Sequence, residues 1–249
     1  MLLFGHRGAR GAAPENTLPG FDHAIAAGAV AVELDVRLAA DGQLVVVHDA
    51  TVDRTTTAAG PVSAYSAAEL AALDARAAFP DWPAAAGIPR LTAVLDRCAG
   101  RVRLAIELKT DTPPRLEAVC ATLIALLRAR GVTRRVTLTS FDPVALELAA
   151  RLAPAIPRAY IGAFDTPAFL ETALRLGCRQ ADIPLARGSA EAVRRAQAAG
   201  LRVVGWPGNT EADLEALLAW GVDGITSDYP SRALAALRAR GISTADDWD

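Results

Sequence analysis

The stretch AEAVRRAQAAGLRVVGWPGNTEADLEALLAWGVDGIT, residues 190–226, contains one pattern twice in succession. A segment rich in alanine and leucine, with its apolar residues at helical spacing, ends at a glycine, and a short apolar run follows. We therefore expect helices at Ala190–Ala199 and Glu211–Trp220, and strands at Leu201–Trp206 and Val222–Thr226. Strands that alternate with helices in this way are typical of a parallel sheet.

The same pattern recurs along the rest of the chain. The further expected strands are Leu2–Phe4, Val30–Val36, Val102–Leu108, Arg135–Thr139, Arg158–Ile161 and Gln180–Ile183. The further expected helices are Thr17–Ala27, Leu91–Ala99, Arg115–Arg130, Pro143–Leu152, Pro167–Leu176 and Ser231–Arg240. Several helices end at a glycine: Gly28, Gly131, Gly177, Gly200, Gly221 and Gly241. Eight β-then-α units in a row predict an α/β fold, a (β/α)8 TIM barrel.

One stretch, about residues 42–91, interrupts this alternation between the second and third barrel strands. It contains a strand, a turn-rich segment and a short helix, and it is too small to form an independent domain. We expect it to be an insertion that packs over one end of the barrel. Residues 1–249 are thus predicted to form a single domain.

The composition excludes several classes of protein. The chain has 249 residues, of which 52% are hydrophobic and 22% charged, so a substantial core is expected. Its formal charge of −2 gives no general reason to bind nucleic acid or an acidic membrane. Cys98, Cys120 and Cys178 are too widely spaced for a CxxC metal site, and we expect them to be buried.

The sequence also bears on localisation. Met1–Phe4 is too short for the apolar region of a signal peptide, and no run of about eighteen apolar residues occurs. We therefore expect a cytoplasmic protein without stable membrane insertion. The sequence leaves its oligomeric state open.

Acidic side chains occur close to the expected carboxyl ends of two strands. Glu33 and Asp35 are two residues apart, and so are Glu107 and Lys109. Side chains two residues apart in a strand point to the same face, and the active sites of TIM barrels lie at the carboxyl ends of the strands. We expect three carboxylates and a lysine to converge there.

A cluster of three carboxylates is costly unless a cation neutralises it. Oxygen ligands suit Mg²⁺, Ca²⁺ or Mn²⁺, so Glu33, Asp35 and Glu107 are candidate ligands for one divalent cation. The alternative is a set of salt bridges, from Glu33 to Arg37 and from Glu107 to Lys109.

Histidine is rare in the chain, and two of its three copies stand in distinctive positions. His6 ends the first expected strand, and His48 lies beyond Asp41-Gly42, a pair that favours a two-residue hairpin loop. Pairing across that loop would place His48 directly opposite Asp35. Each histidine could act as a general acid or base, although His6 alone could also be a hydrogen-bonded structural residue.

Two cations complete this group of residues. Arg7 follows His6, and its planar guanidinium matches the oxygens of a phosphate, to which Lys109 would add a point charge. Two histidines, a metal and two cations are groups suited to phosphodiester hydrolysis. We expect the third histidine, His23, to have a surface or packing role.

Motifs spread over nearly the whole chain are similar to those of one family. They are His6-Arg7-Gly8, Pro14-Glu15-Asn16-Thr17, Glu33-Leu34-Asp35-Val36, His48-Asp49, Arg54-Thr55-Thr56, Ile88-Pro89-Arg90-Leu91, Glu107-Leu108-Lys109, Ser140-Phe141 and Gly224-Ile225-Thr226-Ser227-Asp228-Tyr229-Pro230. On these residues the chain resembles the glycerophosphodiester phosphodiesterases. The resemblance implies a TIM barrel with an insertion after the second strand.

It also implies metal-dependent hydrolysis of glycerophosphodiesters to glycerol 3-phosphate and an alcohol, a reaction of glycerol and lipid metabolism. By the matched positions, the metal ligands would be Glu33, Asp35 and Glu107. His6 and His48 would form the general acid/base pair. Arg7 and Lys109 would contact the phosphate.

The resemblance extends to the substrate pocket. Phe141 and Trp206 look like the family's apolar walls around the glycerol and the leaving group, and packing at the rim is the alternative role. Asn16 is expected to cap the first helix and to fix the loop after His6. The chain departs from the family's usual Trp-Thr-Val-Asn after the seventh strand, because residues 206–209 read Trp-Pro-Gly-Asn.

Two other functions are compatible with such a barrel. A phospholipase D or lysophospholipase D type of enzyme, acting on intact lipids, would need an exposed apolar rim near the pocket. Residues 79–88 offer three large apolar side chains, but prolines and an aspartate interleave with them. A non-catalytic barrel that binds a phosphorylated metabolite would be expected to lack a histidine or a metal ligand, and this chain has them all.

Overall fold

The computed structural model describes residues 1–98, 100–164 and 168–244. The strands are β1 (Leu2–Gly5), β2 (Ala31–Leu38), β3 (Leu44–Val46), β4 (Arg103–Leu108), β5 (Val136–Ser140), β6 (Arg158–Ile161), β7 (Gln180–Pro184), β8 (Arg202–Trp206) and β9 (Gly224–Ser227). The helices are α1 (Leu18–Ala26), α2 (Ala67–Ala72), α3 (Leu91–Cys98), α4 (Pro113–Ala129), α5 (Pro143–Leu152), α6 (Ala168–Arg175), α7 (Ala190–Ala198), α8 (Glu211–Trp220) and α9 (Pro230–Ala239).

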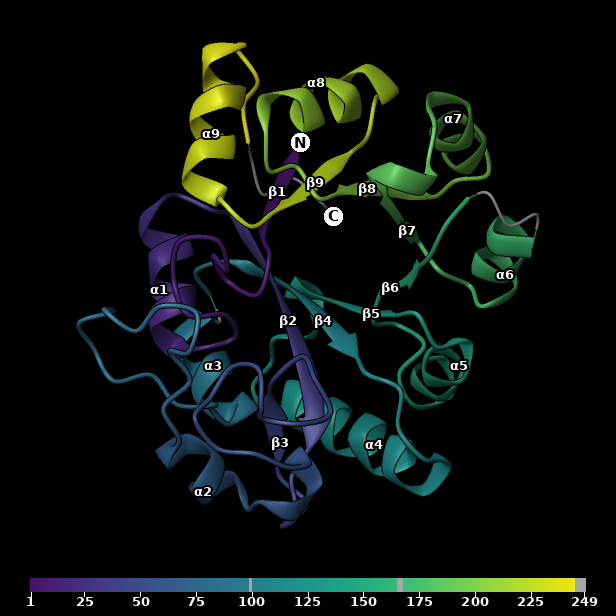
Figure 1. The fold of residues 1–249 in the computed structure, drawn as a ribbon. Helices are drawn as coiled ribbons and strands as arrows, with labels where there is room; N and C mark the ends of the chain where they lie inside the picture. Colours follow the sequence, from purple (N-terminus) through teal and green to yellow (C-terminus); the bar gives the residue numbers. More distant parts are fainter. Residues whose placement is uncertain (99, 165–167, 245–249) are drawn as a thin grey trace.

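Eight parallel strands close into a barrel. The strand order is β1-β9-β8-β7-β6-β5-β4-β2, and β1 pairs with both β9 and β2, which closes the ring. The helices surround the strands, as seen down the barrel in Figure 1. The predicted (β/α)8 barrel is confirmed, and the described ends of its elements lie within two residues of the predicted ones. Two predicted helix ends, Ala99 and Pro167, lie outside the described residues.

Glycines end the helices where the sequence predicts it. All six have positive φ, from +62° at Gly177 to +93° at Gly28. Glycine adopts this left-handed conformation without the steric cost that a Cβ imposes. Each of these glycines therefore stops its helix, and five of them direct the chain toward the next strand.

The alternation of side chains along the strands divides the barrel into two environments. Outward side chains, such as Leu34 and Ile106, pack against the helices in large buried clusters. Inward side chains include Leu2, Phe4 and Val204, which form a smaller apolar cluster inside the barrel. Because Glu33 and Asp35 alternate with buried Leu34, both carboxylates belong to the inward face.

The segment between β2 and α3 adds a short strand and a short helix to the barrel. β3 pairs antiparallel with the carboxyl-terminal part of β2, and α2 follows it, at the lower left of Figure 1. Val45, Val52 and Leu70 belong to a separate buried cluster in this segment. The pairing places the segment at the end of the barrel where β2 carries its carboxylates.

The predicted register of the β2–β3 hairpin is wrong by one residue. Val46 pairs with Val36, and the loop has three residues, closed by a hydrogen bond from Ala39 N to Gln43 O of 2.9 Å. A two-residue type I′ loop needs positive φ at both central residues. Of Asp41 and Gly42, only Gly42 has it, with a φ of +77°.

The shifted register moves His48 away from the position opposite Asp35. The carbonyl of Asp35 instead accepts a hydrogen bond of 3.0 Å from Val47 N, so Val47 is its neighbour across the hairpin. His48 follows the end of β3 and is placed by the loop that begins there. Its carbonyl oxygen accepts a hydrogen bond of 2.9 Å from Arg37 Nε, which fixes the backbone at that point.

Two further expectations can be compared with the structure. Cys98, Cys120 and Cys178 are buried free thiols, as predicted. In the part of the chain that the structure describes, we find no helix that combines the length and the apolar character needed to span a membrane.

Candidate active site at the carboxyl ends of the strands

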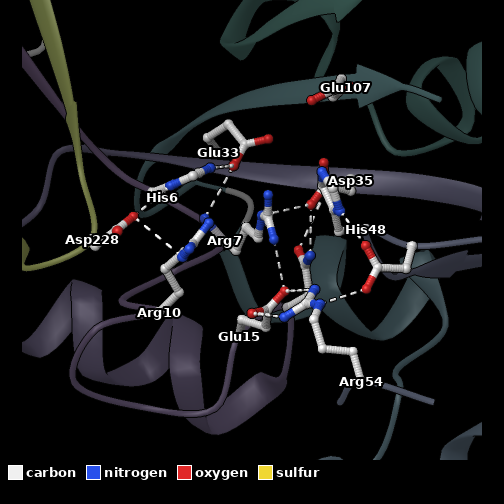
Figure 2. A network of polar contacts seen from close by, with 12 residues as sticks. His6, Arg7, Arg10, Glu15, Glu33, Asp35, His48, Arg54, Glu107 and Asp228 are labelled. Carbon is white, nitrogen blue, oxygen red and sulfur yellow. Dashed lines mark hydrogen bonds and ion pairs between the residues drawn. The ribbon is translucent and has the colours of Figure 1, made fainter. Parts of the chain in front are cut away.

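Three carboxylates meet at the carboxyl end of the barrel. Glu33 and Asp35 come from β2 and Glu107 from β4, where Asp35 and Glu107 are paired in register. One oxygen from each carboxylate lies within 4.8 Å of the others. The predicted convergence of these side chains is therefore confirmed, and Figure 2 shows Glu33 and Asp35 between the two histidines.

Two cations neutralise part of this charge. Lys109 Nζ lies 2.7 Å from Asp35 Oδ1 and 2.6 Å from Glu107 Oε1. Arg7 Nε lies 3.3 Å from Asp35 Oδ2, and the backbone N–H of Arg7 donates to Glu33 Oε2 at 3.0 Å. The predicted phosphate ligands Arg7 and Lys109 thus line the carboxylate cluster.

The salt-bridge alternative is realised only in part. Lys109 pairs with Glu107, as that interpretation required. Arg37 is engaged with the carbonyl of His48, and among the described residues it forms no ion pair with Glu33. Together, Lys109 and Arg7 therefore lie against three carboxylates, those of Glu33, Asp35 and Glu107.

Burial and mutual repulsion shift the pKa values of the three carboxylates in different directions. Burial, together with Asp35, raises the pKa of Glu107 to about 7, and burial with Asp35 and Glu107 holds that of Glu33 well above its ordinary value. Although burial opposes it, Lys109 and Arg7 hold the pKa of Asp35 well below its usual range. A further cation would stabilise the ionised forms, and this oxygen-only donor set fits Mg²⁺, Ca²⁺ or Mn²⁺.

His6 lies at one side of the cluster and is held by an aspartate. Its Nδ1 lies 2.5 Å from Oδ1 of Asp228, and its Nε2 lies 3.8 Å from Glu33 Oε2. Asp228 also accepts a hydrogen bond of 2.9 Å from Asn209 Nδ2, and Arg10 Nε lies 3.5 Å away. A carboxylate on Nδ1 favours the proton there and leaves Nε2 to face the site.

His48 lies at the other side and has a matching partner. Its Nδ1 lies 2.6 Å from Oδ1 of Asp49, whose Oδ2 accepts a hydrogen bond of 2.5 Å from Arg54 Nε. Burial is the largest cause that lowers the pKa of both His6 and His48, so both imidazoles favour the neutral form. Two oriented imidazoles therefore lie on opposite sides of the carboxylate cluster, as Figure 2 shows.

Glu15 joins the segment around His48 to the loop after β1. Its carboxylate accepts two hydrogen bonds from Arg54, each of 2.8 Å, and one of 2.8 Å from Arg7 Nη1. The chain of contacts runs from Arg7 through Glu15, Arg54 and Asp49 to His48. Figure 2 shows Arg7, Glu15 and Arg54 in this network. The position of His48 thus depends on a network that also holds the proposed phosphate ligand Arg7.

The loop after β1 is itself fixed against Asp35. Arg7 and Asn16 have positive φ, +48° and +54°, which is uncommon for residues with a Cβ. Asn16 N donates to Arg7 O at 2.9 Å, and Asn16 Nδ2 donates to Asp35 Oδ2 at 2.7 Å. The predicted capping role of Asn16 is wrong, since Thr17 accepts the hydrogen bond from Gly20 N. Asn16 fixes the loop, as expected.

Two aromatic side chains lie at the rim of the barrel, and a fourth carboxyl group lies in its interior. The rings of Phe141 and Trp206 meet edge to face with centroids 6.3 Å apart, and Phe141 is 49% exposed. Phe141 follows β5 and Trp206 ends β8, so both lie at the carboxyl end of the barrel, and their role as an apolar wall stays a prediction. Below them, burial raises the pKa of Asp182 to about 7, and its Oδ1 accepts a hydrogen bond of 2.7 Å from Gln180 Nε2.

Several contacts to the histidines were not predicted from the sequence. Asp49, Arg54 and Asp228 stand in the motifs of the resemblance, yet their contacts require the folded chain. Asp49 is next to His48 in the sequence, and this adjacency could have indicated their contact. Asp228 is 222 positions from His6, and only the pairing of β1 with β9 brings the two together.

Arg54→Ala is expected to lower kcat for phosphodiester hydrolysis about 10-fold, a size typical of residues that orient a catalytic group. The reason is that Asp49 loses the arginine that holds it against His48. Steady-state kinetics of the purified variant measure this, and Arg54→Lys should recover only part of kcat. Arg97→Ala is a matched control, because Arg97 is similarly exposed and pairs with Asp22 away from the site. A rise in KM at unchanged kcat would instead make Arg54 a substrate ligand.

Comparisons with known proteins agree with this geometry. A sequence model of the glycerophosphoryl diester phosphodiesterase family matches residues 6–232. The chain is 34% identical to a glycerophosphodiester phosphodiesterase of Bacillus altitudinis, over 93% of this chain and 96% of that protein.

Two solved structures have the same fold. One is a glycerophosphodiester phosphodiesterase from Agrobacterium tumefaciens, 33% identical with a TM-score of 0.79, covering 94% of this chain and 99% of that one. The other is an Oleispira antarctica phosphodiesterase in complex with the product sn-glycerol-3-phosphate, 29% identical with a TM-score of 0.86, covering 96% and 97%. The chain described here belongs to the glycerophosphoryl diester phosphodiesterase family.

Proposed function

We propose that this protein hydrolyses glycerophosphodiesters to sn-glycerol 3-phosphate and an alcohol. The observation that carries the proposal is the pair of aspartate-bound histidines, His6 and His48, on opposite sides of a carboxylate cluster. Membership of the family supports it, and so does the related phosphodiesterase that was solved with this product. The overall charge of −2 fits a small anionic substrate bound by local cations.

We infer that Glu33, Asp35 and Glu107 hold one divalent cation, Mg²⁺, Ca²⁺ or Mn²⁺. The short distances between their oxygens and the raised pKa values of Glu33 and Glu107 support this proposal. A bound cation would supply Lewis-acid stabilisation of the negative charge on the phosphodiester.

Arg7 and Lys109 would bind the phosphate oxygens. Both side chains already lie within 3.3 Å of carboxylate oxygens in the cluster. A bound divalent cation would neutralise the carboxylates in place of Arg7 and Lys109. Part of the positive charge of these two side chains would then be available to the phosphate. The planar guanidinium of Arg7 would then orient the phosphodiester, and Lys109 would add a second positive charge.

The two histidines would move the protons. One Nε2 would accept a proton from the nucleophile, while the other imidazole, protonated, would donate a proton to the leaving alkoxide. The aspartate on each Nδ1 supports both roles, because it holds the ring and stabilises the imidazolium that forms. The nucleophile is either water or the neighbouring glycerol hydroxyl, and the second route would give a cyclic phosphate first.

Phe141 and Trp206 would form an apolar wall beside the glycerol or the leaving group. Their edge-to-face contact at the carboxyl ends of β5 and β8 and the exposure of Phe141 support this role. The segment before α3 offers less to an intact lipid, since Ile88 is buried and Trp82 packs against the main core. A single domain over residues 1–249 and a cytoplasmic location remain predictions.

Product analysis with two choline esters tests the proposal. Glycerophosphocholine should give glycerol 3-phosphate and choline, with activity lost on chelation and restored by Mg²⁺, Ca²⁺ or Mn²⁺. Lysophosphatidylcholine should be hydrolysed with a much lower kcat/KM. A preference for lysophosphatidylcholine would favour the lysophospholipase D type of enzyme, and no hydrolysis of any glycerophosphodiester in a broad panel would favour a binding protein.

A further inference from the structure

Two buried polar side chains inside the barrel have no part in the proposed mechanism. Asp182 lies in β7 and Thr226 in β9, the two strands on either side of β8 in Figure 1. Asp182 is 8% exposed and Thr226 is 9% exposed. Buried polar groups normally form hydrogen bonds, because an unpaired group costs free energy when it leaves water. The surroundings of these two side chains therefore bear on function.

The strand pairing places both residues on the inner face of the barrel. Asp182 pairs in register with Val204, and Thr226 pairs with Phe4. Val204 and Phe4 belong to the apolar cluster inside the barrel, and paired residues point to the same side of a sheet. Ile225, the neighbour of Thr226 in sequence, packs on the opposite face against the helices. Asp182 and Thr226 therefore border the apolar cluster in the interior.

The candidate active site begins one step further along the same strands. Trp206 follows the inward residue Val204 by two positions in β8. Asp228, the partner of His6, follows Thr226 by two positions. Residues two apart in a strand share a face. The two buried side chains therefore lie below Trp206, toward the amino-terminal end of the barrel, on the side of the site where His6 lies.

Each of the two side chains has one polar atom without a partner. Oδ1 of Asp182 accepts a hydrogen bond of 2.7 Å from Gln180 Nε2, which orients the carboxyl group. Oδ2 of Asp182 and Oγ1 of Thr226 have no hydrogen-bond partner among the described residues. Neither atom is fully enclosed, in contrast to Oγ1 of Thr139, which is buried without a partner. A small ligand in the site can therefore reach both atoms.

The chemistry of the two side chains indicates what kind of group they bind. Burial and the negative charge of Glu107 raise the pKa of Asp182 to about 7, although the hydrogen bond from Gln180 opposes this shift. Near neutral pH the carboxyl group of Asp182 therefore accepts a hydrogen bond, or donates one when it is protonated. The hydroxyl of Thr226 also donates and accepts. Alcohol hydroxyls match both side chains, whereas an anionic phosphate only accepts and is repelled by the carboxylate.

We propose that Asp182 and Thr226 bind the two hydroxyls of the glycerol moiety and thereby select glycerol over other alcohols. This inference rests on the proposed hydrolysis of glycerophosphodiesters. Strands β7 and β9 are two strand spacings apart, about 10 Å at the backbone. Their inward side chains narrow this gap, so neighbouring hydroxyls can bridge it through hydrogen bonds of about 2.8 Å. An alcohol without these hydroxyls leaves buried polar atoms unpaired and binds more weakly.

Isothermal titration calorimetry with two phosphate monoesters tests this proposal on the full chain in the presence of Mg²⁺. Glycerol 3-phosphate and propyl phosphate share the phosphate and the three-carbon chain, but only glycerol 3-phosphate has hydroxyls. The wild-type chain should bind glycerol 3-phosphate roughly 10-fold more tightly, which corresponds to about 1.4 kcal/mol. Asp182→Ala and Thr226→Val should each reduce this preference about 3-fold, the usual effect of one lost hydrogen bond. The double variant should bind the two esters equally.

Two controls make the measurement specific. Thr139→Val removes another buried threonine of the inner face, whose enclosed hydroxyl contacts no ligand, and should leave the preference unchanged. Every variant should bind propyl phosphate as the wild-type chain does, which shows that the phosphate site is folded. If Asp182→Ala fails this check because Gln180 loses its partner, Thr226→Val decides, since the hydroxyl of Thr226 has no described partner to lose.

Three outcomes would overturn the proposal. The first is that the wild-type chain binds the two esters equally or binds neither, and the second is that the double variant keeps the full preference. The third is an unchanged preference in Asp182→Ala together with a lower kcat/KM for glycerophosphocholine, which would assign Asp182 to the leaving alcohol. Binding of the monoesters needs no hydrolysis. The expected preference in a chain that hydrolyses no glycerophosphodiester would therefore support this site while contradicting the proposed function.

Discussion

Replacing His6 by alanine is expected to lower kcat for glycerophosphocholine hydrolysis by about 10²- to 10⁴-fold, the usual contribution of one positioned proton-transfer group. KM should change little, because the proposed phosphate ligands Arg7 and Lys109 remain. The effect is large because the Nε2 of His6 faces the site while Asp228 holds its Nδ1 at 2.5 Å. Steady-state kinetics with a metal-saturated enzyme measure both parameters.

Two comparisons make this experiment specific. His23→Ala removes the third histidine, which lies in α1 with its ring 6.0 Å from that of Trp82, and should leave kcat unchanged. Added imidazole should restore part of the activity of His6→Ala, since it can take the place of the missing ring. Turnover near the wild-type value in His6→Ala would remove His6 from the proposed acid/base pair.

The fold could be predicted because its signals are local. The helices that end at Gly200 and Gly221 are each followed by a short apolar run, and this junction depends on residues that are adjacent in sequence. The inward direction of Glu33 and Asp35 follows from the two-residue period of a strand in the same way. Both predictions needed no knowledge of distant contacts.

The hairpin register shows where such reasoning fails. Asp41-Gly42 is a pair that is frequent in two-residue hairpin loops, but these two residue types alone do not determine the φ angle of Asp41. Asp41 instead accepts hydrogen bonds from Gln43 N and Ala67 N, and α2 supplies the second of these. The hydrogen bond from Ala67, the first residue of α2 and more than twenty positions after Asp41, therefore accompanies a β2–β3 loop of three residues rather than two.

The partners of the histidines could not be predicted for a related reason. Closure of the barrel brings Asp228 to His6, and packing of the segment after β3 brings Arg54 to Glu15. Neither pair has a periodic signal in the sequence. The histidines themselves were identifiable because their residue type is rare in the chain and suited to acid/base chemistry.

The metal site offers the second large effect. Glu107→Gln is expected to lower kcat roughly 10²- to 10³-fold, similar to the loss of one group that stabilises the transition state electrostatically. Glutamine keeps the shape of the side chain but removes one negative charge from the proposed ligand set. Lys109 keeps its contact with Asp35, 2.7 Å away, so the substitution leaves no buried cation without a partner.

Thermal unfolding with added metal tests the site without reference to activity. A ligand that binds only the folded protein raises the free energy of unfolding by about 2.7 kcal/mol at a concentration 100 times its Kd. Wild-type Tm should therefore rise by several degrees with Mg²⁺, Ca²⁺ or Mn²⁺, while Glu107→Gln should show little or no rise. Asp182→Asn is the matched control, since Asp182 is also a buried carboxyl with a pKa raised to about 7 but is not a proposed metal ligand. A full metal-dependent rise in Glu107→Gln would contradict the assignment, because a site that loses one of three carboxylates should bind a divalent cation far more weakly.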